Sequence, residues 1–286
     1  MTLPNRKFGV EIEYVGVERD VIINALADIG VKCVSEHYNH NTRKHWKIVR
    51  DGSLRHRNGE SYTGELVSPP LSGKRGLDKL RKVVDAIKMA GATVNYSCGF
   101  HVHVGVKDLT PNQIVAIPHR YGYLESKINK FMNHSRIDST WAWTVSKNYT
   151  ANLVRNVRYE MDAYKLNFKR ATLNLTSKYR KVNISSYGRY GTVEFRQHQG
   201  TVNSEMACNW VQFCLHFVEH VFNNVPQTNN LNLPVKKDLK LFNEIPEEVA
   251  SYYKNLVKKK DAKSKAKAQK MRVPFENFPA TMGQIA

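Results

Sequence analysis

The chain of 286 residues is long enough to bury a sizeable core in one large domain or two small ones. Its hydrophobic fraction of 41% excludes disorder of the whole chain, and no apolar run approaches the ~20 residues that a membrane-spanning helix needs. The net charge of +19 favours anionic partners such as phosphates, nucleotides or nucleic acid.

The N-terminal segment and the cysteines indicate the cellular compartment. The first residues lack the apolar region of a signal peptide. The four cysteines form neither a C-x-x-C pair nor a dense disulfide framework. We therefore expect an intracellular, cytoplasmic protein with reduced thiols.

The first predicted element is a strand over residues 7–14 (KFGVEIEY). Side chains alternate between the two faces of a strand, so four apolar residues share one face and Glu11 and Glu13 share the other. Hydrophobic periodicity and turn residues then predict a short series of elements. In chain order they are a helix over 18–31, a strand over 45–50, a turn at 51–53, a strand over 65–67 and a helix over 74–89.

The second half of the chain begins with a predicted strand over 100–106 (FHVHVGV), in which His101 and His103 lie opposite an apolar face. Thr110 as cap and Pro111 predict a helix that continues through Met132, and Pro118 should kink or divide it. The remaining elements are mixed short elements over 135–190, a strand over 192–198 (TVEFRQH), a helix over 204–223 and a lysine-rich helix from Glu247.

Three of these strands combine an apolar face with a face of acidic, basic or histidine side chains. Each has an ordinary explanation when taken singly, as a solvated strand face, a hydrogen-bonded histidine pair or a cross-strand ion pair. If the strands share one sheet, however, Glu11, Glu13, Glu194 and Glu65 become neighbours. Two carboxylates ~4 Å apart repel by roughly 4 kcal/mol at an effective dielectric constant of 20, so a cation is needed among them. Arg196 or a hard divalent cation meets this need.

Carboxylate-bound magnesium in positive surroundings is typical of phosphoryl transfer from a nucleotide. The sequence contains neither a G-x-x-x-x-G-K-[ST] loop nor a G-x-G-x-x-G fingerprint. Metal ions and side chains, rather than a glycine-rich loop, would therefore hold the phosphates.

The ordered motifs E-x-E, D-G-S, GELVSPPL, CGFHVHVGV and TVEFRQHQGT, spread between Phe8 and Trp210, resemble those of the amidoligase family. This family belongs to the carboxylate-amine ligase superfamily, with glutamine synthetase and glutamate-cysteine ligase. The resemblance implies an α+β fold, in which a curved antiparallel sheet forms a concave active site and helices pack on the outer face, as in the catalytic domain of glutamine synthetase. It also implies ATP- and Mg²⁺-dependent amide formation through an acyl phosphate, with Mn²⁺ as an alternative metal.

The resemblance also implies roles for individual residues. It assigns metal ligation to Glu11, Glu13, Glu65, His101 and Glu194. Arg196 and His103 would be catalytic and would contact the nucleotide phosphates, with Arg180 as a further phosphate or substrate contact. Asp51, Ser53 and Asn183 would line the substrate site. The second acid that accompanies Glu65 in glutamine synthetase has no clear match. Either Glu60 or Asp51 replaces it, or one of the three metal positions of that enzyme is missing here.

The resemblance leads us to expect a catalytic domain over residues 1–240 and a C-terminal helix with a basic extension over 241–286. Residues 254–286 alone carry a net charge of +7, which leaves +12 for the rest of the chain. Small members of the family are often encoded by bacteria and their phages, so a phage origin is one expectation. The acid, the amine and the oligomeric state stay open.

Two other functions stay open at this point. The first is a metal-dependent hydrolase or oxygenase that binds zinc or iron through His101, His103 and Glu194. The second is an accessory binding protein for nucleic acid or another polyanion that uses the basic tail.

Overall fold

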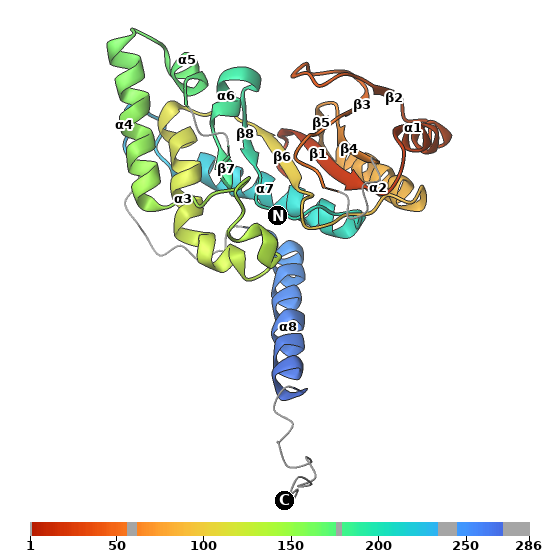
Figure 1. Cartoon of the computed structure of the whole chain (residues 1–286). Coiled ribbons are helices and arrows are strands. Elements are labelled where there is room, and N and C mark those ends of the chain that lie inside the picture. Colours follow the sequence, from red (N-terminus) through yellow and green to blue (C-terminus); the bar gives the residue numbers. More distant parts are fainter. Residues whose placement is uncertain (1, 56–61, 176–178, 234–244, 271–286) are drawn as a thin grey trace, which may run out of the picture.

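The computed structural model describes residues 2–55, 62–175, 179–233 and 245–270 (Figure 1). They form a mixed α+β structure. The strands are β1 (Lys7–Val15), β2 (Cys33–Ser35), β3 (Trp46–Val49), β4 (Thr63–Val67), β5 (Leu71–Ser72), β6 (Phe100–Gly105), β7 (Val182–Asn183) and β8 (Thr192–Phe195). The helices are α1 (Arg19–Asp28), α2 (Gly73–Met89), α3 (Pro111–Asn129), α4 (Lys147–Ala163), α5 (Phe168–Leu173), α6 (Ser185–Tyr190), α7 (Ser204–Asn224) and α8 (Glu247–Lys270), with a 3₁₀ turn, η1, at His134–Arg136.

The eight strands form one open sheet in the order β2-β3-β4-β1-β6-β8-β7, and β5 pairs with β1 beside the end of β4. Only the β2–β3 pair is parallel among these strands. Pro69 and Pro70 separate β4 from β5, because proline has no N–H to donate to a ladder. The prediction that the first strand, the H-x-H strand and the E-x-R strand share a sheet is therefore confirmed.

The register of these strands decides which polar side chains meet. Glu13 on β1 lies directly opposite Glu65 on β4, and Glu11 lies opposite His101 on β6. On the other side of β6, His103 lies opposite Glu194 on β8. All of these residues belong to the face that alternates with the apolar one.

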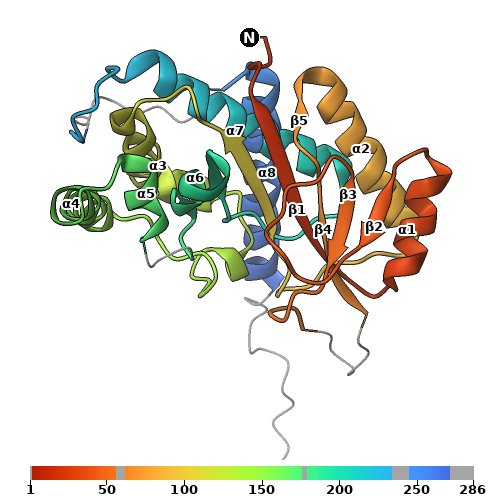
Figure 2. The same ribbon diagram turned by 90° about the horizontal axis from the view of Figure 1, so that it is seen from above.

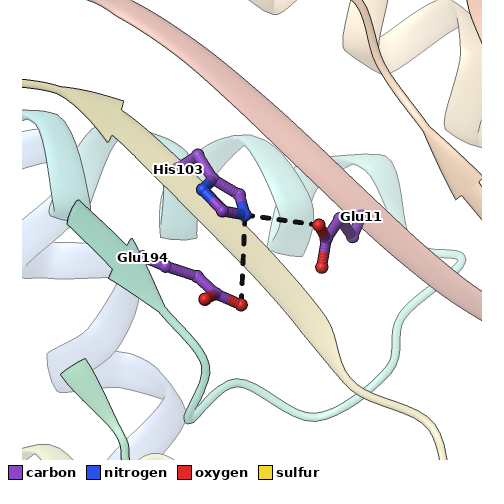
Figure 3. A group of neighbouring side chains, drawn as sticks. All are labelled: Glu11, His103 and Glu194. Atoms are coloured by element: carbon purple, nitrogen blue, oxygen red, sulfur yellow. Dashed lines mark hydrogen bonds and ion pairs between the residues drawn. The ribbon is translucent and has the colours of Figure 1, made fainter. Parts of the chain in front are cut away.

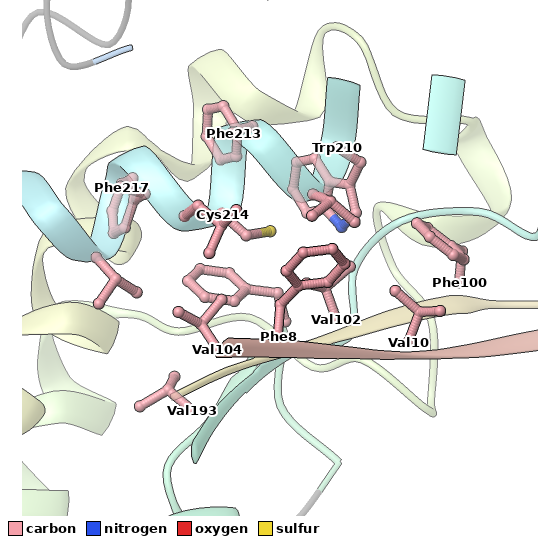
Figure 4. Close-up of a cluster of buried hydrophobic side chains, with 14 of the residues drawn as sticks. Phe8, Val10, Phe100, Val102, Val104, Val193, Trp210, Phe213, Cys214 and Phe217 are labelled. Carbon is pink, nitrogen blue, oxygen red and sulfur yellow. The ribbon is translucent and has the colours of Figure 1, made fainter. Parts of the chain in front are cut away.

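The apolar face of the sheet packs against α7, and α2 packs beside α7 (Figures 2 and 4). Phe8, Val102 and Val104 are buried beneath the aromatic stripe of the helix. In that stripe the rings of Trp210 and Phe213 stack with centroids 4.9 Å apart. Truncating one such aromatic side chain typically costs 3–5 kcal/mol, so this layer anchors the strands that carry the polar face.

Two helices differ from the sequence prediction. Pro118 does not divide α3, which runs without a break from Pro111 to Asn129, because burial of most of the helix compensates for the missing N–H. The prediction of short elements over 135–190 was wrong for α4, which is 17 residues long. Its signal was present in the apolar spacing of Leu153, Val154 and Val157, all of which are buried.

The last helix, α8, begins against the body of the protein and then extends away from it (Figure 1). Tyr253 packs against the rings of Phe131 and Phe213, with centroids 4.2 and 5.9 Å away. The predicted boundary at residue 240 lies outside the described residues. None of the helices in the described part of the chain combines the length and the apolar character needed to cross a membrane.

Candidate metal and anion site

The polar face of the sheet lines an open pocket of about 2610 Å³. This volume exceeds the roughly 300–1,000 Å³ that is common for small-ligand pockets, so the pocket can accept more than one reactant. Ten of the predicted site residues line it: Glu11, Glu13, Asp51, Ser53, Glu65, His101, His103, Asn183, Glu194 and Arg196.

Glu11 lies between the two histidines of β6. Its Oε2 is 3.0 Å from Nδ1 of His101. Its Oε1 is 3.3 Å from Nε2 of His103 (Figure 3). Burial favours the protonated acid, but the hydrogen bonds from both rings outweigh it and hold the pKa of Glu11 well below its usual range. Glu11 is therefore ionised at neutral pH and accepts from both imidazoles.

Glu194 occupies the other side of His103. Arg196 donates from Nη1 to Oε1 of Glu194, and Asn183 donates from Nδ2 to Oε2 at 2.8 Å. Burial opposes ionisation of Glu194, yet Arg196 and His103 lower its pKa. Burial also opposes the charged form of His103, but Glu194 and Glu11 raise the pKa of the imidazole. The ring of His103 thus holds a proton between two carboxylates, with its Nδ1 3.0 Å from Oγ1 of Thr192.

Glu13 and Glu65 form the more buried end of the cluster, with 5% and 7% of their surfaces exposed. The main-chain N–H of Gly99 donates to Oε2 of Glu13 at 2.5 Å. Burial and the charges of Glu11 and Glu13 raise the pKa of Glu65 well above its usual value. Burial and the neighbouring carboxylates therefore favour the protonated form of Glu65, as expected when several carboxylates share one cavity.

The donor atoms of this cluster fit a divalent cation. One ligand atom each from Glu11, His103 and Glu194 lie within 4.8 Å of one another. Carboxylate oxygens suit Mg²⁺ and Mn²⁺, and the imidazole nitrogen also suits transition metals. A cation at this position would relieve the repulsion that raises the pKa of Glu65.

Comparison with known proteins places the chain in a family. The family model described as "Putative amidoligase enzyme" matches residues 4–218, which include β1 to β8 and most of α7. The chain belongs to the amidoligase family. No curated protein matches the chain. The family indicates that this amidoligase is an enzyme of the ligase type.

The D-G-S segment of the amidoligase forms a tight turn at the edge of the pocket. Asp51 accepts a hydrogen bond from the main-chain N–H of Ser53 at 2.7 Å. The negative charge of Asp51 also contributes to the raised pKa of Glu65. Glu60, the other candidate for an accompanying acid, lies outside the described residues.

Two residues lie apart from the cluster. Arg180 does not line the pocket; its guanidinium stacks on the ring of Tyr149, 4.1 Å from the centroid, and donates to the carbonyl oxygen of Thr144. The predicted polar face of the E-x-R strand does not extend to His198, because β8 ends at Phe195. His198 is 2% exposed and packs in the core against the ring of Trp210, with centroids 5.2 Å apart.

Sequence reasoning missed three features of the pocket. Arg136, from η1, is buried beside Glu13 and Gly99. Tyr190 lies edge-on to His103 with ring centroids 5.9 Å apart. Trp141 is 42% exposed and accepts a hydrogen bond from Nε of Arg196 on its carbonyl oxygen. The abundance of arginine and aromatic residues over 135–190 was the available signal, but no spacing connected it to the acidic strands.

Proposed function

We propose that this amidoligase is an ATP- and magnesium-dependent carboxylate-amine ligase that forms an amide through an acyl phosphate. The observation that supports the proposal most directly is the meeting of Glu11, His103 and Glu194 beside Arg196 in one pocket. We also propose that residues 1–240 form a catalytic domain like that of glutamine synthetase, in which the sheet is curved around the active site. Cytoplasmic location remains a prediction.

Glu11, His103 and Glu194 would hold the metal ion, with Glu13, Glu65 and His101 adjoining. When bound, the metal supplies charge neutralisation for phosphate oxygens, which is the main requirement of phosphoryl transfer. Mn²⁺ could replace Mg²⁺ at a site with imidazole ligands.

The side chains of the chain position and stabilise the reactants. Arg196 keeps its positive charge, because Glu194 and Glu11 outweigh the effect of burial and raise its pKa. A fixed guanidinium beside the cluster offers paired donors for phosphate oxygens as negative charge builds on the transferring group. His103, held between Glu11 and Glu194, would ligate the metal ion through its neutral ring, so the further positive charge on that side would come from the metal ion.

The proposed reaction has two steps, a phosphoryl transfer and the formation of the amide. A carboxylate oxygen of the acid attacks the γ-phosphorus of ATP, and the bond from that phosphorus to the bridging oxygen breaks, which releases ADP. The amine nitrogen then attacks the acyl carbon, the bond from that carbon to the phosphate oxygen breaks, and the amine loses a proton. Holding acid, nucleotide and amine together removes the entropic cost of their encounter.

The hydrolase or oxygenase alternative has less support from the geometry. Among the described residues, the potential metal-binding group joins Glu11 to His103 and Glu194, and His101 is not part of it. Tightly bound zinc or iron in purified protein, without any effect of ATP on thermal stability, would revive this alternative.

The proposal is tested with purified protein, Mg-ATP and a panel of amino acids, peptides, other carboxylates and amines. We expect release of ADP and phosphate with at least one pair of substrates, and binding of Mg-ATP by calorimetry. Glu11→Gln should abolish both signals, whereas Glu205→Gln, an exposed change in the first turn of α7, should keep them. Neither nucleotide binding nor turnover by the wild type would refute the enzyme hypothesis.

A further inference from the structure

Arg136 is a buried cation of the pocket to which no sequence motif assigns a role. It ends the 3₁₀ turn between α3 and α4, only 2% of its surface is exposed, and it lines the pocket. A buried guanidinium is costly to desolvate and usually lies against a carboxylate.

The hydrogen bonds of Arg136 within the described residues go to the main chain instead. Nη2 donates to the carbonyl oxygen of Arg196 at 2.7 Å, and Nε donates to the carbonyl oxygen of Gln197 at 3.3 Å. A guanidinium has five N–H donors, so these two bonds fix its plane and leave donors for the pocket. The carbonyl partners orient the side chain without neutralising its charge.

Gly99 allows the guanidinium to reach the acidic cluster. A Cβ atom at this position would lie 3.1 Å from Nη2 of Arg136 and 2.6 Å from Nε2 of His101. The N–H of the same glycine donates to Glu13. The guanidinium therefore lies at the Glu13 end of the cluster, whereas Arg196 pairs with Glu194 at the other end.

We propose that Arg136 binds an oxyanion of a reactant, a carboxylate or phosphate oxygen, at the Glu13 end of the pocket. This inference rests on the proposed function, because such an oxyanion would be shared between Arg136 and the metal ion that the carboxylates would hold. It divides the anionic groups of the reactants between two arginines, one near Glu13 and one paired with Glu194. The planar fork of arginine suits both kinds of oxyanion, which a lysine at this position would hold less well.

A purely positioning role for Arg136, through the carbonyl oxygens of Arg196 and Gln197, makes a different prediction. Loosening the end of β8 would disturb Glu194 and Arg196 together, so affinity for a metal cation and for an anion would fall together. Loss of a direct anion contact would weaken anion binding alone, and removing a positive charge near Glu13 would leave cation affinity unchanged or increase it.

The test is calorimetric titration of the full chain with Mn²⁺, followed by inorganic phosphate and, separately, acetate. We expect Arg136→Gln to weaken affinity for at least one anion by tenfold or more while Mn²⁺ affinity stays the same or rises. Selective loss of affinity for acetate would assign the contact to the substrate carboxylate. Selective loss of affinity for phosphate would assign it to the phosphoryl group. Arg55→Gln, which removes an exposed arginine at the rim of the same pocket, is the matched control. It should retain the wild-type affinity for Mn²⁺ and for the anions.

Arg136→Lys keeps the positive charge and replaces the glutamine variant in these titrations if that variant does not fold. The lysine variant should weaken anion binding by at least threefold. Unchanged binding of both anions, or parallel loss of Mn²⁺ and anion affinity, would overturn the inference. Anion titrations in the presence of chelator distinguish failure of the Arg136 inference from failure of the proposed function. A wild type that binds no Mn²⁺ contradicts the metal site, whereas the anion titration of metal-free protein still decides the role of Arg136.

Discussion

Glu65 and Glu194 carry the same functional group but differ in charge state because their neighbours differ. Glu65 lies among carboxylates, and its pKa is raised by burial and by Glu11 and Glu13. Glu194 is ionised beside Arg196 and Asn183. Identical substitutions at the two positions should therefore affect metal-free protein in opposite ways.

Glu65→Gln should leave the free energy of unfolding in chelator at pH 7 unchanged or raise it. The raised pKa favours the neutral form of folded Glu65, so the substitution removes repulsion among buried carboxylates and breaks no ion pair. Glu194→Gln should lower this free energy by about 3–5 kcal/mol, because it removes the carboxylate that is paired with the buried Arg196. Urea unfolding of both variants measures the difference, and a larger loss at Glu65 than at Glu194 would refute these charge states.

His198 predicts a pH dependence that is independent of the acidic cluster. Burial lowers its pKa to about 3, from 6.5 for an unperturbed histidine. Below pH 6.5 the unfolded chain binds a proton that folded His198 does not, so stability falls as the pH falls from 6.5 towards 3. At pH 5 the loss from this residue is about 2 kcal/mol.

The measurement compares unfolding free energies at pH 7.5 and pH 5 for the wild type and for His198→Asn, whose amide can still donate to the carbonyl oxygen of Gln199. The variant should lose about 2 kcal/mol less on acidification than the wild type. His134→Asn, an exposed histidine in η1, should behave like the wild type. Equal losses in all three proteins would contradict the burial argument.

At the level of elements, the site depends on which strands are neighbours. Alternation in KFGVEIEY and FHVHVGV predicts the polar faces, because a strand reverses its side chains at every residue. Alternation says nothing about pairing, so the order β4-β1-β6-β8, which aligns Glu65 with Glu13 and His103 with Glu194, came from the structure. The resemblance to the amidoligase family, unlike the periodicity, predicted that the polar faces of these strands meet in one site.

The segment that carries Trp141 is fixed against α3. Glu125 accepts hydrogen bonds from the N–H of Val145 at 2.9 Å and from Nζ of Lys181 at 2.8 Å, and the carbonyl of Lys181 accepts from the N–H of Arg196. Gly122 permits this close packing, since a Cβ there would lie far inside van der Waals contact with the carbonyl oxygen of Val145.

Gly122→Ala should therefore destabilise the protein by about 3 kcal/mol, through steric overlap with main chain that cannot rotate away. Thermal or urea unfolding measures the loss. Gly52→Ala is the control, because an added methyl group there meets nothing within 4 Å, and it should change stability by less than about 0.5 kcal/mol. An unchanged stability for Gly122→Ala would show that α3 and the Trp141 segment do not pack as described.

At the scale of the whole molecule, the acidic cavity lies within a protein of net charge +19. Hydrophobic periods of two and about 3.6 residues predicted most of the individual strands and helices, whereas the α+β class was implied by the resemblance to the amidoligase family. Arg136 could not be found in this way, because its position beside Glu13 depends on the packing of η1 against the end of β8. Local sequence patterns do not predict a contact between segments that are distant in the chain.

The basic end of the chain should bind polyanions independently of the pocket. Deleting residues 254–286 removes a net charge of +7 but keeps Tyr253 and its ring contacts. Retention of the protein on immobilised DNA should shift to clearly lower salt, because fewer phosphates are neutralised. Retention that is unchanged by the deletion, in a variant with native circular dichroism, would refute a role for the tail.

A crystal structure of the protein with Mg²⁺ and a non-hydrolysable ATP analogue tests the central claim most directly. We predict a metal ion coordinated by Glu11 and Glu194, with the triphosphate extending towards Arg196 in the same pocket. Nucleotide bound at another surface, or a pocket in which these carboxylates coordinate no metal ion at saturating Mg²⁺, would contradict the account.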